Sequence, residues 1–405
     1  MVKFDLVAIP FHDWKKNQSE GFRTRDAHLL QEFSRHPSID KLLIVDRPIS
    51  LVERLVFNRN WKVNGTKELY NRDTRALSQV GENTFVLDIR YPDFIGPITK
   101  GKGWISGAYQ RSTTIDAIKE AFRHLSIQDP VFYISSPLPI PLIEQIEDPF
   151  LVFDAVDNLT KIPAYASIRL EIARYYSIAK AIATIIFTNS EKTRKWLAEG
   201  RQKVYSIPNG VDPMHLAKNP GQTPPDLAEI AHPIVGYAGK MQEMFSIEII
   251  SYAAQSLPDT NFVLIGQQLN PKWMKPLWKI PNVHYLGDKH YQDLPNYLAG
   301  FDICVVPYSE ERQHDVDPIK FYEYLYMEKP VITTNVGSVQ EYSNFPNVKI
   351  ASDPENFAKA LSDFLEKIRN GETISAGNLP ESVFWKSKAD QMIHIIETEW
   401  KGKRS

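Results

Sequence analysis

The chain is poor in cysteine and has no long apolar run. Its 405 residues include a single cysteine, Cys304, so no internal disulfide can form. Cys304 lies within the apolar segment Phe301 to Tyr308, which favours a buried structural thiol over a nucleophile. No apolar segment approaches the about 20 residues that cross a bilayer, and the start, MVKFDLVAIPF, is interrupted too early for a signal peptide. We therefore expect a cytoplasmic protein.

Metal-binding spacings and a strong net charge are also missing. The ten histidines form no HExxH motif and no tight Cys/His cluster, so the sequence predicts no metal site. The net charge of −2 argues against a nucleic-acid-binding surface over the whole molecule. A basic excess lies between Arg54 and Arg123. It is consistent with a surface that rests on anionic lipid or with an ordinary solvated face.

What is present fits a globular α/β protein. Hydrophobic residues make up 43% and charged residues 24%, and the length suggests two domains. The first half alternates strands and helices, which predicts a doubly wound α/β domain. The expected strands are 4–10, 41–45, 84–88, 131–135, 150–155, 183–189 and 203–207. The expected helices are 22–35, 168–181 and a short one that Ser190 caps and Gly200 stops.

Three parts of this half are read as irregular. His12 to Gly21 is expected to be a polar loop, and residues 91–107 a loop over a cleft or a long connection. Residues 49–80 have no clear period. A second α/β domain follows a proline-rich linker that ends at Pro233. Its first three strands are 234–238, 261–265 and 283–286, with helices at 245–255 and 294–298, and an amphipathic helix is expected from Trp385 to Trp400.

The segment from Asp315 to Thr334 combines an expected helix with several charged residues. We predict a helix between the strand Phe301 to Tyr308 and a strand from Val331, with Asp317 as its cap and Pro318 in its first turn. Lys320 and Glu323 then share one helix face. At the carboxyl edge of a parallel sheet, this arrangement suits a phosphorylated ligand. A capped surface helix with an incidental lysine and glutamate is the alternative.

Glycines and charged residues at other strand ends extend this prediction. Gly239, Gly266 and Gly287 each follow a strand, where glycine permits close backbone approach or simply ends a strand. Lys240 could neutralise phosphate or be a solvated surface lysine.

In the first domain, Gly21, Arg23 and Arg25 could hold an anion at a helix start or form a flexible polar loop. Asp154 and Asp157 follow a strand, where a carboxylate can contact sugar hydroxyls or serve as a turn or cap residue.

These residues resemble the retaining, nucleotide-sugar-dependent glycosyltransferases of family four, in the branch that builds bacterial cell-surface polysaccharides. The resemblance covers roughly residues 183–345. It rests on these motifs: IPNGVD (207–212), GYAGKM (236–241), VHYLG (283–287), DICVVPY (302–308) and DPIKFYEYLYMEKPVITT (317–334). It implies the GT-B fold of two Rossmann-like domains facing each other across a cleft. Residues 1–208 would bind the acceptor, with 386–405 packing back on them as a crossover helix, and 209–385 would bind the donor.

The resemblance also implies roles for individual residues. Glu323 occupies the second position of the family's E-x7-E pair, which binds the donor ribose, and Asp315 occupies the first, where glutamate is common. Lys240 falls where the family places a cation on the donor phosphates. A second family lysine is missing from the stretch MQEMFS (241–246), and Lys320 is our candidate to replace it.

The predicted activity is transfer of a hexose from a UDP- or GDP-sugar to a glycan acceptor, expected to be lipid-linked. No cofactor or metal is expected, because cations and helix N-termini can stabilise the diphosphate leaving group. Asp315, Lys240 and Lys320 are the catalytic candidates. Glu323, the three glycines and Asp317 are the donor-binding candidates, and Gly21, Arg23, Arg25 and Asp157 would line the acceptor side. Peripheral contact with the inner membrane face is expected. A nucleotide-sugar epimerase and a non-catalytic nucleotide-sugar-binding subunit are the alternatives.

Overall fold

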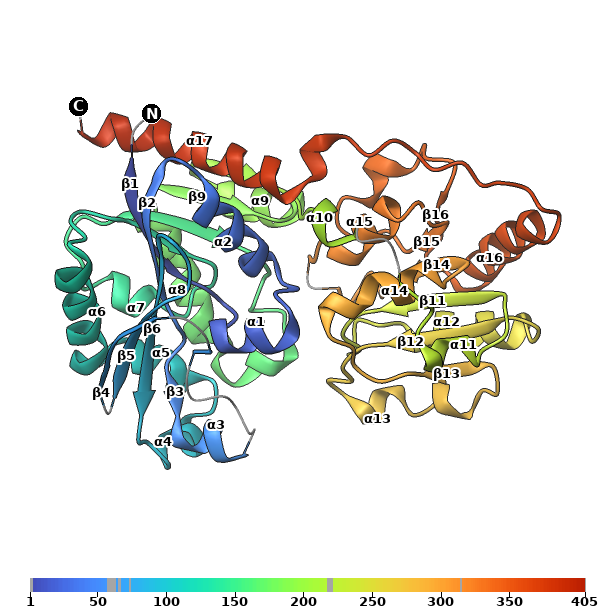
Figure 1. Ribbon diagram of the computed structural model, residues 1–405, viewed down its shortest axis with the longest axis horizontal. Helices are drawn as coiled ribbons and strands as arrows, with labels where there is room; N and C mark the ends of the chain where they lie inside the picture. The colour runs from blue at the N-terminus through green and yellow to red at the C-terminus, as the bar shows by residue number, and fades with distance from the viewer. Residues whose placement is uncertain are drawn as a thin grey trace. The chain divides into compact units, whose positions relative to one another are not determined.

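The chain forms two compact α/β units, seen in a computed structural model that describes residues 3–56, 63–64, 67–72, 74–216, 221–313 and 315–404 (Figure 1). The first unit comprises Met1–Ile207 and Trp385–Ser405, and the second comprises Pro208–Phe384. Each unit is built on its own sheet of mainly parallel strands with helices between them. The predicted two-domain α/β fold is therefore confirmed.

The first unit contains a ten-stranded sheet. Its order is β10-β9-β8-β7-β1-β2-β6-β5-β4, and β3 pairs with β6 outside this path. The β4–β5 and β5–β6 pairs are antiparallel, while the other pairs are parallel. The strands are β1 (Phe4–Ile9), β2 (Ile39–Val45), β3 (Ile49–Ser50), β4 (Lys67–Arg72), β5 (Arg75–Gln79), β6 (Thr84–Tyr91), β7 (Val131–Ile134), β8 (Phe150–Ala155), β9 (Ile185–Thr188) and β10 (Val204–Ser206). All seven strands expected from sequence are present, while β3, β4 and β5 were missed.

Helices join these strands. They are α1 (Trp14–Glu20), α2 (Arg25–Arg35), α3 (Leu51–Val56), α4 (Gly96–Lys100), α5 (Gly103–Tyr109), α6 (Ser112–Leu125), α7 (Ile140–Ile143), the 3₁₀ helix η1 (Pro163–Ile168), α8 (Arg169–Ile182), α9 (Glu191–Ala198) and α17 (Trp385–Arg404). The Ser190 side chain accepts a hydrogen bond from Thr193 N, as expected of the cap of α9.

Two loop predictions were wrong. The expected polar loop 12–21 contains α1, which begins because the Asp13 side chain accepts a hydrogen bond from Lys16 N. The following helix α2 starts at Arg25 instead of Phe22, which has a positive φ of 62° that no helix residue adopts. Residues 91–107 contain α4 and α5, and Asp93 Oδ1 accepts a hydrogen bond from Gly96 N at the start of α4.

The second unit contains a six-stranded, wholly parallel sheet in the order β13-β12-β11-β14-β15-β16. Its strands are β11 (Ile234–Ala238), β12 (Asn261–Ile265), β13 (Val283–Tyr285), β14 (Ile303–Val306), β15 (Val331–Thr333) and β16 (Val348–Ile350). Its helices are α10 (Pro213–Leu216), α11 (Pro225–Ala228), α12 (Ile247–Ser256), α13 (Pro271–Met274), η2 (Leu277–Lys279), η3 (Tyr291–Asp293), α14 (Leu294–Ala299), α15 (Ile319–Tyr326), η4 (Val339–Tyr342), α16 (Pro354–Arg369) and η5 (Glu381–Val383). The expected linker therefore includes a helical turn, α11, inside this unit.

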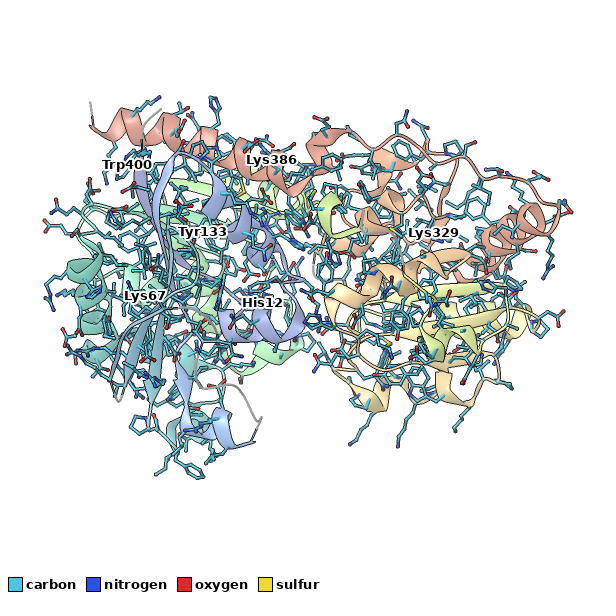
Figure 2. All side chains as sticks on the ribbon, viewed as in Figure 1. His12, Lys67, Tyr133, Lys329, Lys386 and Trp400 are labelled. Carbon is cyan, nitrogen blue, oxygen red and sulfur yellow. The ribbon has the colours of Figure 1, made fainter. Side chains whose placement is uncertain are left out.

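Buried side chains explain why the elements pack as they do. Apart from the hairpin β4–β5, the strands of both sheets are largely apolar and buried, as expected for sheets covered on two faces. Cys304 is fully buried in β14, which confirms the prediction of a structural thiol. On α17, the Trp400 ring lies edge-on to Phe150 with centroids 5.0 Å apart, and Figure 2 labels Trp400 on this last helix of the chain. Among the described residues, no helix is both long enough and apolar enough to span a bilayer.

Candidate functional site

The strand ends of the second sheet bring two glycines into close contact. A Cβ on Gly266 would lie 2.0 Å from the carbonyl oxygen of Gly239, and the Gly266 φ is +130°. A Cβ on Gly239 would lie 2.3 Å from Cε of Lys320. Only glycine allows these segments to approach so closely, and the lysine crosses directly over the end of β11. Gly239 and Gly266 therefore permit close approach, as predicted, and the atoms that approach them belong to the protein itself.

Lys320 is held in this place by aromatic residues. Its Nζ donates a 2.5 Å hydrogen bond to the Tyr308 hydroxyl and lies 5.0 Å and 5.4 Å from the ring centroids of Tyr308 and Tyr237. The Tyr237 hydroxyl in turn donates to the carbonyl oxygen of Lys240 at 2.8 Å. One cluster therefore lies at the carboxyl edge of the second sheet, and it consists of half-buried Lys320, the phenols of Tyr237 and Tyr308, and the 239–240 turn. Such a cluster can receive an anionic group.

Glu323 lies one helical turn from Lys320, on the buried part of α15. Its Oε1 accepts a 2.6 Å hydrogen bond from the Tyr291 hydroxyl, and the ring of Tyr291 stacks on His215 with centroids 4.0 Å apart and an interplanar angle of 15°. Burial raises the pKa of Glu323, and the Tyr291 hydrogen bond and the charge of Lys320 oppose this rise. A buried carboxylate that has one hydroxyl donor on one oxygen can accept further hydroxyl donors.

Asp317 has a different part from the expected one. It does not cap α15, whose N-cap is Pro318 and lacks a side-chain hydrogen bond, so the capping prediction was wrong. Its buried carboxylate accepts from Asn209 N at 2.6 Å and from Ser338 N at 3.1 Å. Tyr322 donates to both of its oxygens at 3.0 Å. Asp317 thus joins three segments of the second unit through hydrogen bonds, and its bond with Tyr322 ties it to α15.

The remaining donor-side candidates lie close in sequence to this cluster. Asp315 is 6% exposed and has a positive φ of 64°, an uncommon backbone state for a residue with a side chain. Lys240 is half-buried directly after Gly239. Gly287 has a φ of +80° with open space around its Cβ position, and its carbonyl accepts from Gly266 N at 2.8 Å. Their ligand roles stay predictions.

In the first unit, Arg25 is a buried structural residue, in contrast to the predicted anion site. Its guanidinium donates to both oxygens of Asp154 at 2.9 Å and 3.1 Å and to the Ile207 carbonyl at 2.9 Å. Tyr133 adds a 2.6 Å hydrogen bond to Asp154. Arg25 is only 3% exposed, so its charge is compensated inside the fold. Asp154 is likewise neither a cap nor a sugar contact.

The other acceptor-side candidates are more open. Gly21 ends α1 in the left-handed conformation with φ of 87°. Arg23 Nε lies 3.0 Å from Glu20 Oε2, which suits a local ion pair. Asp157 is half-buried, and its Oδ1 accepts from Asn189 Nδ2 at 3.4 Å. Nothing in these contacts tests an acceptor role. The described residues contain no group of three His, Cys, Asp or Glu side chains that could hold a metal ion.

Sequence reasoning missed the aromatic members of the site. In the sequence, Tyr237 and Tyr308 look like ordinary core residues of apolar strands. Tyr291 follows a strand and belongs to no recognisable motif. A phenol near the end of an apolar strand was the available signal, since a buried hydroxyl needs a partner there.

Comparisons with known proteins agree with this picture. Residues 232–367 match the family model described as glycosyl transferases group 1. TuaH of Bacillus subtilis, named as a candidate glycosyltransferase of teichuronic acid biosynthesis, is 28% identical over 151 residues. That alignment covers 36% of this chain and 38% of TuaH, so the chain matches well under half of its curated relative.

Two solved structures illustrate the likeness in fold. Sucrose-phosphate synthase from Thermosynechococcus elongatus has a TM-score of 0.68 at 14% identity, covering 98% of this chain and 100% of that one. The Anabaena protein HepE in complex with UDP and glucose has a TM-score of 0.60 at 14% identity, covering 99% and 100%. Residues 232–367 are therefore similar to the glycosyltransferase group 1 family, within a chain that has the two-domain α/β fold of GT-B glycosyltransferase structures.

Proposed function

We propose that this protein is a glycosyltransferase that moves a hexose from a nucleoside-diphosphate sugar to a glycan acceptor, without a metal ion and with retention of anomeric configuration. The observation that carries the proposal is the pairing on α15 of Lys320, held over two phenols, with Glu323, held by Tyr291. A cation suited to phosphate and a carboxylate suited to ribose hydroxyls stand one helical turn apart, which matches the two ends of a nucleoside diphosphate.

The donor half of the reaction follows from these residues. Negative charge grows on the diphosphate as the glycosidic bond breaks, and preorganised cations stabilise that charge. Lys320, Lys240 and the N–H groups at the start of α15 are the groups we assign to this task. Glu323 accepts hydrogen bonds from the ribose and fixes the nucleotide. Asp315 is our candidate for contact with the donor sugar.

The acceptor half is assigned to the first unit. We propose a lipid-linked glycan of cell-surface polysaccharide synthesis, in a cytoplasmic enzyme that works at the membrane face. TuaH, by its name a teichuronic acid biosynthesis protein, supports this acceptor class, and the HepE complex with UDP and glucose supports the donor class. Gly21, Arg23 and Asp157 remain the residues proposed to face the acceptor.

A thermal-shift screen against UDP, GDP and ADP tests the donor site. A nucleotide that binds only the folded protein raises the midpoint, by an amount set by its concentration relative to Kd. We expect UDP or GDP to raise it in the wild type and to lose this effect in Glu323→Ala. Glu355→Ala, which removes an exposed glutamate of α16, is the matched control and keeps the shift. Equal midpoint shifts in Glu323→Ala and Glu355→Ala would show that Glu323 does not contact the nucleotide. No midpoint shift with any nucleotide in the wild type would overturn the proposal.

A further inference from the structure

Exposed apolar side chains gather at one place on the first unit. The described residues include ten large hydrophobic side chains that are exposed, and four of them lie at α4 and at the start of α8. Their exposed fractions are 51% for Phe94, 71% for Ile95, 64% for Ile98 and 88% for Leu170. The concentration is notable because scattered single hydrophobics are normal, whereas a cluster marks an interaction surface.

The two segments are joined by packing within the first unit. A Cβ on Gly103 would lie 3.3 Å from Cγ2 of Ile168, the residue before α8. Lys102 Nζ lies 5.5 Å above the ring of Tyr165 in η1. The residues directly after α4 and those directly before α8 are thus neighbours. We call Phe94, Ile95, Ile98, Lys100, Lys102, Arg169 and Leu170 together the α4/α8 surface. Figure 1 shows α4 at the periphery of its unit.

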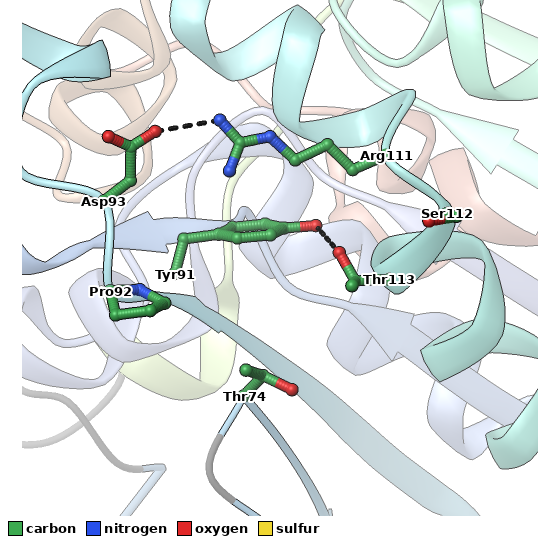
Figure 3. Close-up of a pocket in the computed structure, with 7 residues that line it drawn as sticks. All are labelled: Thr74, Tyr91, Pro92, Asp93, Arg111, Ser112 and Thr113. Atoms are coloured by element: carbon green, nitrogen blue, oxygen red, sulfur yellow. Dashed lines mark hydrogen bonds and ion pairs between the residues drawn. The ribbon is translucent and has the colours of Figure 1, made fainter.

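The α4/α8 surface stands on a rigid polar base. Asp93 accepts three hydrogen bonds of 2.8 Å, from Gly96 N, Trp104 Nε1 and Arg111 Nη2. The Arg111 guanidinium lies over the ring of Tyr91, 4.5 Å from its centroid. Figure 3 shows Tyr91, Asp93 and Arg111 among the residues that line a pocket here. Asp93 thus ties the start of α4 to α5 and to Arg111 before α6, beneath the exposed apolar side chains of α4.

Charge on the α4/α8 surface is positive. Lys100, Lys102 and Arg169 are exposed. The acidic residues of the same segments are engaged by protein groups: Asp93 bonds as above, and half-buried Glu171 accepts a hydrogen bond from the Tyr175 hydroxyl. A ring of cations around protruding apolar side chains is complementary to phosphate headgroups above an acyl layer.

We propose that the α4/α8 surface docks this protein on an anionic lipid bilayer. Ile95, Ile98 and Leu170 enter the boundary between headgroups and acyl chains, and the three cations contact lipid phosphates. Lipid is favoured over a protein partner because exposed cations flank the protruding apolar side chains, the charge pattern that anionic headgroups above an acyl layer complement. The docking would bring the first unit to a lipid-linked acceptor, so it extends the proposed function while resting on separate residues.

Flotation of the full chain with vesicles tests this docking. We expect binding to vesicles of phosphatidylcholine with phosphatidylglycerol and much weaker binding to phosphatidylcholine alone, with loss of binding at high salt. Ile95→Ser with Ile98→Ser should weaken binding about tenfold, since it removes the apolar insertion. Lys100→Glu with Lys102→Glu should weaken it about 25-fold or more, because each cation near an anionic surface contributes about fivefold.

Matched controls come from the second unit. Tyr252→Ser with Leu269→Ser removes exposed hydrophobics, and Lys272→Glu with Lys275→Glu reverses exposed charges, and both should bind vesicles like the wild type. All variants should keep the nucleotide-induced thermal shift, which separates lost docking from lost folding or a failed donor site. The proposal would be overturned if the wild-type protein did not bind anionic vesicles, or if the α4/α8 variants bound them as strongly as the wild type. A dimer that becomes monomeric in Ile95→Ser with Ile98→Ser would overturn it in favour of self-association.

Discussion

The Tyr291 hydroxyl donates a 2.6 Å hydrogen bond to Glu323, and the ring that carries it lies flat against His215. Three segments of the second unit, α10, η3 and α15, meet through these side chains. Glu323 is largely buried at 3% exposed, and the Tyr291 phenol fixes its Oε1. Tyr291 is therefore a positioning residue for Glu323 in the proposed donor site.

Tyr291→Phe should weaken nucleotide binding by about tenfold to 150-fold, since a hydrogen bond to a charged group contributes about 1.5–3 kcal/mol. Without the hydroxyl the pKa of Glu323 rises further, because this hydrogen bond now opposes the effect of burial. The ionised carboxylate then becomes rarer at low pH, so the loss of affinity should be larger at pH 6 than at pH 8. Titration calorimetry at both pH values measures this. Tyr252→Phe, which changes an exposed tyrosine, should alter neither value. A loss that is equal at both pH values would argue for a packing role alone.

Gly266→Ala should destabilise the second unit by about 2–4 kcal/mol. The new Cβ would meet the Gly239 carbonyl at 2.0 Å, and the φ of +130° is closed to alanine. Gly287→Ala is the graded control, because its Cβ enters open space and only the φ of +80° is unfavourable, at about 1–2 kcal/mol. Urea unfolding of both variants compares them. Equal destabilisation would mean that backbone conformation, and not the approach to Gly239, makes glycine necessary at 266.

Much of the fold was predictable because buried parallel strands leave a strong apolar signal. The segments FLVF and ICVV read directly as β8 and β14, and the cap at Ser190 and the final helix were found from local chemistry. The hairpin β4–β5 was missed because β4 is mostly exposed and polar, and β5 buries two consecutive residues, Ala76 and Leu77, so neither strand shows a period of two. Helix α1 was missed because a run of polar residues gave no apolar stripe.

The site was predictable only where a motif carries the chemistry. Lys320 and Glu323 were predicted from their spacing on one helix, and the structure places Lys320 against the Gly239 turn and Glu323 against Tyr291. Arg25 was misassigned because sequence cannot show that Asp154, 129 positions away, occupies its guanidinium. The same limit applies to Asp317, whose partners Asn209 and Ser338 come from distant segments. Long-range partners decide whether a charged residue is structural or available to a ligand.

Arg25→Met should destabilise the first unit by about 3–5 kcal/mol, because it leaves Asp154 buried without its cation. Adding Asp154→Leu should restore much of this loss, since a buried ion pair can often be exchanged for apolar side chains of similar size. Chemical unfolding of the two single variants and the double variant gives the coupling energy. Additive losses in the double variant would contradict the direct pairing. Arg35→Met, at an exposed arginine of α2, should change stability by less than about 0.5 kcal/mol.

Acid sensitivity of the first unit should depend on Asp26. Burial acts to raise the pKa of this carboxyl, but the charge and hydrogen bonds of His12 and a hydrogen bond from Thr24 outweigh burial and lower it to about 2. A folded-state pKa below the unfolded value adds stability above about pH 4, and this stability is lost as the pH falls toward 2. A shift of this size corresponds to roughly 2 kcal/mol.

Asp26→Asn should therefore lower stability at pH 7 by roughly 2 kcal/mol and flatten the dependence of unfolding free energy on pH between 4 and 2. Urea unfolding at several pH values in this range measures both effects. Asp116→Asn is the control, because Asp116 is exposed on α6, and it should follow the wild-type profile. If Asp26→Asn kept the wild-type slope below pH 4, other carboxyl groups would be responsible for acid unfolding. If it lost stability equally at every pH, the hydrogen bonds of Asp26, and not its charge, would be what the fold requires.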